Sequence, residues 1–125
     1  MTTEAQLDAL FRVAQLKSDL ELRKFSAFRG HVVAMETRID RIRGELSDLC
    51  ASAAPDSLAD LRAAAAIAGR DADALMRAEA ELARMRPNFD AARAKAVREF
   101  GRAQVLSHLK AGAADARRAK RDGTP

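Results

Sequence analysis

The stretch FSAFRGHVVAMETRIDRIRGELSDL, residues 25–49, decides the fold because its large apolar residues recur at alternating steps of three and four. This spacing is the signature of a coiled-coil seam, the stripe along which one helix packs against another. The same register continues toward the N-terminus, with a polar interruption at Ser18 and Glu21. The predicted seam positions are Leu7, Phe11, Ala14, Phe25, Phe28, Val32, Met35, Ile39, Ile42, Leu46 and Leu49.

The composition favours the same fold. The 125 residues include five Phe and no Trp or Tyr, although compact globular cores usually rely on large aromatic residues. Ala, Leu, Arg, Glu and Lys dominate, and these residues form helices readily. We therefore expect an all-α protein built as a long antiparallel two-helix coiled-coil hairpin.

A break in the pattern divides the chain into two arms. Pro55 cannot continue a preceding helix, and Asp56 or Ser57 can cap the next one. We expect a single hairpin domain over residues 1–118, with a weak point at Gly69, where Asp71 could cap a restart, and a kink near Met85–Arg86 before Pro87. Its parts are a first arm over about 3–50, a turn over about 51–56, a second arm over about 57–116, and a frayed basic tail over 117–125.

The second arm carries a softer heptad pattern, and folding the chain back at residues 53–54 aligns the two arms. This register places Leu46 opposite Leu61, Leu7 opposite Phe100 and Glu21 opposite Arg86, so that Glu21 and Arg86 form a register pair. It also leaves residues 104–125 as an overhang beyond the N-terminus. The alternative, that any two heptad arms can be aligned this well, stays open. The predicted seam of the second arm is Leu58, Leu61, Ala65, Ala68, Ala72, Leu75, Leu82, Phe89 and Ala96.

Few residues could carry chemistry. His31 and His108 lie on different arms, Cys50 is the single cysteine, and the chain has no CxxC or HExxH motif. We expect no enzyme, no catalytic residue, no metal and no cofactor. The lone cysteine fits a reducing compartment, and the chain has neither a secretory signal nor an apolar run near the roughly 20 residues of a transmembrane helix. A soluble, cytoplasmic protein is expected.

Two features predict a binding surface. Leu10, Val13, Leu16 and Leu20 lie roughly opposite the seam, and a helix that is apolar on two faces is usually buried on both. A partner protein, a second copy or a third helical segment could cover them; the alternative is that the C-terminal overhang folds back over them.

The second feature is a basic C-terminal third: residues 86–125 carry ten basic and four acidic side chains. Arg98, Arg102 and Lys110 are its candidate partner-binding residues. A basic helix face is usually solvated or complementary to an acidic protein, and nucleic-acid binding is the weaker alternative because no aromatic stacking residues accompany it.

The opening LDALFRVAQLK, residues 7–17, followed by a long heptad arm, a short Ala/Pro turn and a basic second arm, resembles the FliJ-type stalk family of flagellar and related type III protein export systems. The resemblance implies a non-catalytic hairpin similar to the central stalk of rotary ATPases, whose paired termini enter the pore of a hexameric export ATPase. It also implies contacts with the export gate and with secretion chaperones, in the cytoplasm or peripherally at the inner-membrane export apparatus.

Two other functions stay open. One is a self-associating helical scaffold or a secretion-chaperone-like binding protein, which would bury the N-terminal apolar residues in a homodimer. The other is weak nucleic-acid binding through the basic C-terminal arm.

Overall fold

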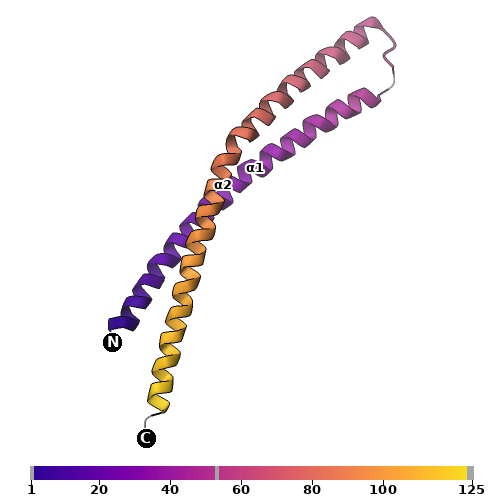
Figure 1. The fold of residues 1–125 in the computed structure, drawn as a ribbon. Helices are drawn as coiled ribbons and strands as arrows, with labels where there is room; N and C mark the ends of the chain where they lie inside the picture. Colours follow the sequence, from indigo (N-terminus) through magenta and orange to yellow (C-terminus); the bar gives the residue numbers. More distant parts are fainter. Residues whose placement is uncertain (1, 53, 124–125) are drawn as a thin grey trace. The chain divides into compact units, whose positions relative to one another are not determined.

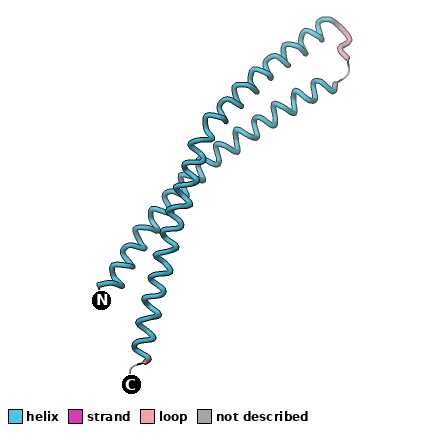
Figure 2. The backbone as a smooth tube through the Cα atoms, viewed as in Figure 1, coloured by secondary structure: helices cyan, strands magenta, loops and turns pink. Residues whose placement is uncertain are grey.

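The computed structural model describes residues 2–52 and 54–123, and these form two long helices (Figure 1). Helix α1 spans Thr2–Ala51 and helix α2 spans Leu58–Asp122, with no strand in the described residues. Figure 2 shows the two helices joined by one short loop. The prediction of an all-α helical hairpin is confirmed.

Local capping interactions explain where the loop begins and ends. The Ser52 hydroxyl donates a hydrogen bond to the Leu49 carbonyl (2.8 Å), just past the end of α1. At the start of α2, the Asp60 N–H donates to the Ser57 hydroxyl (3.1 Å) and the Leu61 N–H donates to the Ser57 carbonyl (3.0 Å). Ser57 thereby satisfies N–H groups that have no partner inside the helix. Ala53, part of the predicted fold-back point, lies outside the described residues.

Helix α2 is more continuous than the sequence predicts. The weak point expected at Gly69 does not interrupt the helix, and Asp71, the possible cap of a restart, is a half-buried residue of its interior. The helix also passes through Pro87. It continues to Asp122, beyond the predicted end at about Ala116, and Gly123 N–H donates to the Ala119 carbonyl (2.9 Å) just past it. The expected frayed tail is therefore helical over most of its length.

The chain forms two compact units, whereas the sequence was interpreted as one hairpin domain. We call Met1–Ala27 together with Asp90–Pro125 the terminal unit, and Phe28–Phe89 the turn unit. Both helices contribute to each unit, and within each unit they run antiparallel. In the terminal unit, Lys110 pairs with Asp8 (2.7 Å) and Arg117 with Glu4 (3.0 Å). In the turn unit, Arg43 pairs with Glu79 (2.6 Å).

The predicted seam of the first arm is confirmed, because all of its positions are buried or half-buried, including the polar Ser18 and Glu21. Val32, Ile39 and Ile42 are the large buried residues of the turn unit. In the terminal unit the buried residues are small or polar. They are Ala14, Ser18, Ala96, Glu99 and Ala103.

The predicted seam of the second arm is half right. Ala68, Leu75, Leu82, Phe89 and Ala96 are buried or half-buried, whereas Leu58, Leu61, Ala65 and Ala72 are exposed. The other half of the α2 seam lies three residues after each of the five confirmed positions. The side chains there are small, polar or flexible, and they therefore give no apolar signal in the sequence. They include Asp71, Ala78, Met85, Ala92 and Glu99.

The register also differs from the prediction. Asp8 of α1 pairs with Lys110 of α2. The predicted register instead places Leu7, the residue before Asp8, opposite Phe100. The physical reason lies at the turn: the first turns of α2 are helical but unpaired, and Leu58 and Leu61 are 62% and 51% exposed. The expected overhang of residues 104–125 is correspondingly wrong, because Lys110 and Arg117 already pair with α1.

Candidate partner-binding surface

The four apolar residues predicted to need a partner are exposed. Leu10 is 54% exposed, Val13 57%, Leu16 68% and Leu20 46%. Helix α2 packs against the seam of α1, none of these four side chains lies on that seam, and no described part of the C-terminal segment buries them. The alternative, that a C-terminal overhang folds back over these side chains, is therefore not seen in the described residues. We call these four residues the collar.

Helix α2 adds exposed apolar residues that the sequence does not predict as part of a binding surface. Val97, Phe100, Val105 and Leu109 are all 48% exposed or more. The sequence predicts Phe100 to lie opposite Leu7 on the seam, and it assigns Val97, Val105 and Leu109 no part in a binding surface. Their heptad positions could have revealed them, since none falls on the true α2 seam defined by Ala96, Ala103 and Lys110. The terminal unit therefore exposes large apolar residues from both of its helices.

Part of this apolar surface forms a groove between the two helices, with a volume of about 420 Å³. We call it the collar groove. Its apolar walls come from Leu10 and Val13 on α1 and from Val105 and Leu106 on α2. Gly101 contributes no side chain and leaves the α2 wall open, because nothing lies within 4 Å of where its Cβ would be. The remaining lining residues are Ala14, Lys17, Glu99 and Arg102.

A second groove of the terminal unit, about 300 Å³ in volume, is lined by other residues. We call it the Phe25 groove, and its lining consists of Leu22, Phe25, Arg93, Ala96, Val97 and Phe100. No residue lines both grooves. They follow opposite flanks of the helix pair, because Leu22 and Leu10 fall on opposite sides of the seam in the heptad repeat.

The three predicted basic binding residues have different surroundings. The Lys110 ammonium lies 2.7 Å from the Asp8 carboxylate and 5.2 Å from the centre of the Phe11 ring. Arg102 donates a hydrogen bond to Glu99 (2.9 Å). Arg98 forms no ion pair with any described residue and remains available to a partner. Lys110 is instead a structural contact between the helices.

The Lys110–Asp8 contact also changes an acidity. A hydrogen bond from Lys110 is the main cause that lowers the pKa of Asp8 from its ordinary value of 3.8. The charges of Arg12 and Lys110 act in the same direction, while desolvation acts against them. The carboxylate of Asp8 is therefore stabilised in its charged form in the folded protein.

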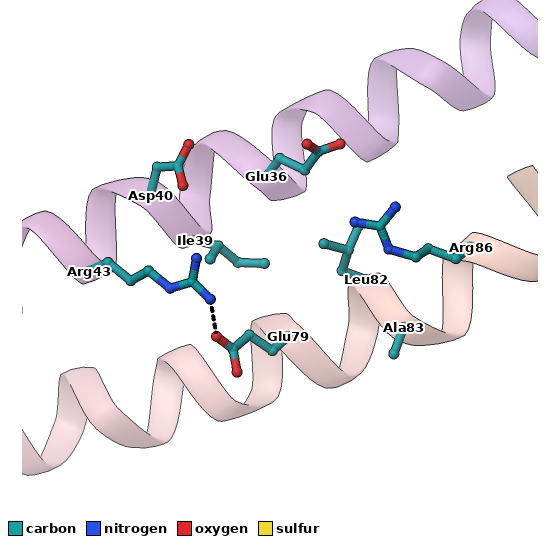
Figure 3. A pocket seen from close by; sticks show the side chains of 8 residues that line it. All are labelled: Glu36, Ile39, Asp40, Arg43, Glu79, Leu82, Ala83 and Arg86. Carbon is teal, nitrogen blue, oxygen red and sulfur yellow. Dashed lines mark hydrogen bonds and ion pairs between the residues drawn. The ribbon is translucent and has the colours of Figure 1, made fainter.

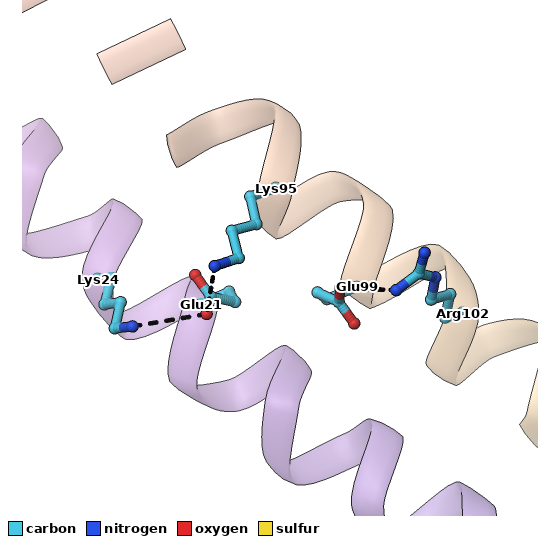
Figure 4. Close-up of polar contacts among 5 residues, drawn as sticks. All are labelled: Glu21, Lys24, Lys95, Glu99 and Arg102. Atoms are coloured by element: carbon cyan, nitrogen blue, oxygen red, sulfur yellow. Dashed lines mark hydrogen bonds and ion pairs between the residues drawn. The ribbon is translucent and has the colours of Figure 1, made fainter. Parts of the chain in front are cut away.

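The polar interruption of the seam contains a small charged network (Figure 4). The predicted register pair was Glu21 with Arg86, but Glu21 lies 3.6 Å from both Lys24 and Lys95. Lys95 stands nine positions after Arg86, which reflects the shifted register. Near this network, the Ser18 hydroxyl is buried and has no hydrogen-bond partner.

Arg86 instead belongs to a charged groove of the turn unit, shown with its labelled side chains in Figure 3. Glu36, Asp40 and Arg43 of α1 line it together with Glu79 and Arg86 of α2. The groove is lined by three acidic and two basic side chains, and Arg43 binds Glu79 directly. This groove has no uniform charge with which to select a charged partner.

The remaining candidates for chemistry lie apart from one another on the surface. Cys50, His31 and His108 are exposed. Residues 2–52 and 54–123 contain no cluster of three His, Cys, Asp or Glu side chains that could hold a metal ion. In the same residues, no helix is both apolar and long enough to cross a membrane.

Comparison of the chain with protein-family models, with curated proteins and with solved structures finds no match.

Proposed function

We propose that this protein is a non-catalytic helical stalk that couples to a partner protein through its terminal unit. The partner would be the export ATPase ring of a flagellar or type III export system. The observation that carries the proposal is the exposed collar of the terminal unit. Large exposed apolar patches of this kind mark interaction sites.

The basic C-terminal segment contributes less to the proposed contact than the sequence suggests. Lys110 and Arg117 are engaged with Asp8 and Glu4, so a projecting basic tip is not what would meet the ring. The apolar collar is the better candidate for the contact, because apolar area supplies most of the binding free energy in protein association. Partner binding would act mechanically if the affinity differed among the states of the ring, since differential affinity shifts a conformational equilibrium.

Steady-state ATP hydrolysis by the purified cognate export ATPase tests the proposal. We expect the protein to raise the rate, and we expect Leu16→Ser to lower that stimulation. Met76→Ser is the matched control, because Met76 is exposed to a similar degree (70% against 68%) but belongs to the turn unit. No stimulation despite demonstrable binding would exclude the coupling function.

A second candidate function is self-association through the same collar, which the exposure of four large apolar residues also favours. Light scattering over a concentration series distinguishes the two functions. A stalk that reserves the collar for another protein is expected to be a monomer. A tight dimer that Leu16→Ser dissociates would favour the scaffold.

A further inference from the structure

The collar groove has a uniform charge along its rims. On α1, Leu10, Lys17 and Lys24 stand seven residues apart and therefore on one face, with Val13 and Leu20 beside them. On α2, Lys95, Arg102 and Leu109 also stand seven residues apart on one face, and Arg98 and Val105 lie beside them. Both rims thus combine apolar with basic residues and carry no acidic one. This pattern is repeated on the two helices that border the groove.

The only carboxylates within this surface are already neutralised. Glu99, which is 7% exposed, binds Arg102 at 2.9 Å. Glu21 lies between Lys24 and Lys95, at 3.6 Å from each, as Figure 4 shows. Lys17 and Arg98 have no ion pair with a described residue. The surface therefore keeps a net positive charge around its apolar floor.

We propose that the collar groove binds an amphipathic helix with an apolar stripe and acidic flanks, contributed by a partner protein. The inference rests on the proposed function, since it names the chemistry of the partner that the terminal unit would bind. A third helix laid into the groove covers Leu10, Val13 and Val105 and completes a three-helix bundle. Its acidic side chains meet Lys17 and Arg98, whose charges are otherwise unsatisfied.

The length of the surface sets the length of the occupant. Leu10 to Lys24 is a stretch of 15 residues on α1, or roughly 21 Å at a rise of about 1.5 Å per residue. A partner helix of about four turns is therefore needed to contact the groove together with the rims that extend to Lys24.

The charge pattern also argues against a second copy of this chain as the occupant. Two copies joined through this groove would bring the basic rims of both together, and like charges at an interface oppose association. The Phe25 groove has a mixed border in comparison, with Arg93 on α2 and Asp19 on α1. An acidic helix has no electrostatic reason to prefer the Phe25 groove.

Binding of two helix-stapled, fluorescent peptides to the full chain tests the proposal. Both peptides carry the same leucine stripe over about four turns; one has Glu at all flanking positions and the other has Lys. We expect the Glu peptide to bind with a micromolar Kd that weakens as salt is added, and the Lys peptide to bind at least about tenfold more weakly. Equal binding of the two peptides, or no binding of the Glu peptide, would overturn the proposal.

Matched variants locate the binding site. Val105→Ser and Arg98→Glu are each expected to weaken binding of the Glu peptide by about tenfold or more. Val97→Ser and Arg93→Glu are their controls in the Phe25 groove, and Val97 is exposed to a similar degree as Val105 (63% against 59%). Circular dichroism is expected to show an unchanged fold for all four variants, since each side chain is exposed. Sensitivity to the control variants alone would move the site to the Phe25 groove and refute the proposal.

Two further results separate this inference from the proposed function. Dimerisation of the chain that Val105→Ser abolishes would identify a second copy as the occupant and contradict the proposal. Stimulation of the ATPase that persists unchanged in Arg98→Glu would refute the acidic helix while leaving the coupling function intact. Peptide binding without any stimulation of the ATPase would refute the coupling function alone.

Discussion

At the scale of single residues, the contact between Lys110 and Asp8 makes the folding stability depend on pH. Asp8 has a folded-state pKa below 3.8 because Lys110 donates a hydrogen bond to its carboxylate. A depressed folded-state pKa means that Asp8 stabilises the fold above about pH 4 and loses this contribution as the pH falls through the folded pKa. We expect an NMR titration to place the Asp8 carboxyl below 3.8, and Lys110→Met to raise its pKa toward that value. An identical titration in both proteins would contradict the contact.

Ser18 offers a second test at the residue scale. Its side chain is 1% exposed, and its hydroxyl has no hydrogen-bond partner. Burying an unsatisfied hydroxyl is unfavourable, so Ser18→Ala is expected to raise the free energy of unfolding by about 1 kcal/mol. Urea denaturation measures the change. Ser26→Ala, on an exposed position of the same helix, controls for the higher helix propensity of Ala, and an equal gain in both variants would argue that the hydroxyl is satisfied.

At the scale of the elements, Gly69 shows that one weak helix former does not end a long helix. The sequence predicts a weak point there, yet α2 is continuous. A Cβ at Gly69 would meet nothing within 4 Å, so Gly69→Ala gains helix propensity without a clash. We expect a stabilisation of about 1 kcal/mol, seen as a higher Tm by circular dichroism. Gly123 is the contrasting position, because its Cβ would lie 3.2 Å from the Ala119 carbonyl oxygen, and the same gain there would contradict this explanation.

The two helices differ in how much of their packing the sequence could predict. Helix α1 uses large apolar residues such as Val32 and Ile39 at its seam, so every predicted seam position of α1 is buried or half-buried. Half of the seam positions of α2 carry residues such as Asp71, Ala78 and Glu99. In a sequence, these residue types cannot be distinguished from those of an exposed helix face.

The register and the candidate site were predictable to different degrees. The register failed because the unpaired start of α2 at Leu58 is a tertiary feature that no local signal reveals. The collar was found because Leu10 and Leu16 are apolar residues off the seam. The collar groove was not found, since it requires the correct register of α2 against α1.

At the scale of the whole molecule, the two units bury different kinds of side chain. The turn unit buries Val32, Ile39 and Ile42, whereas the terminal unit buries alanines together with Ser18 and Glu99. Large aliphatic side chains gain more free energy from burial than Ala or polar ones. We therefore expect the terminal unit to open more readily than the turn unit.

Native-state hydrogen exchange measures this difference. Amides of residues 10–22 and 96–106 are expected to exchange faster than those of residues 32–46 and 71–85, at equal intrinsic rates. Equal protection in the two sets, or the reverse order, would contradict the expectation. Ile39→Ala is expected to destabilise the turn unit by about 2–5 kcal/mol and to reduce its advantage in protection.

The ion pairs between the helices also determine how the protein responds to a pulling force. Both chain ends belong to the terminal unit, where Arg117 holds Glu4 and Lys110 holds Asp8. A force applied between the ends would therefore peel the antiparallel helices apart, rupturing these contacts in succession, Glu4 first. A load applied along the helix axes would strain all of the contacts at once. The terminal unit is thus mechanically anisotropic, weaker against peeling than against shear.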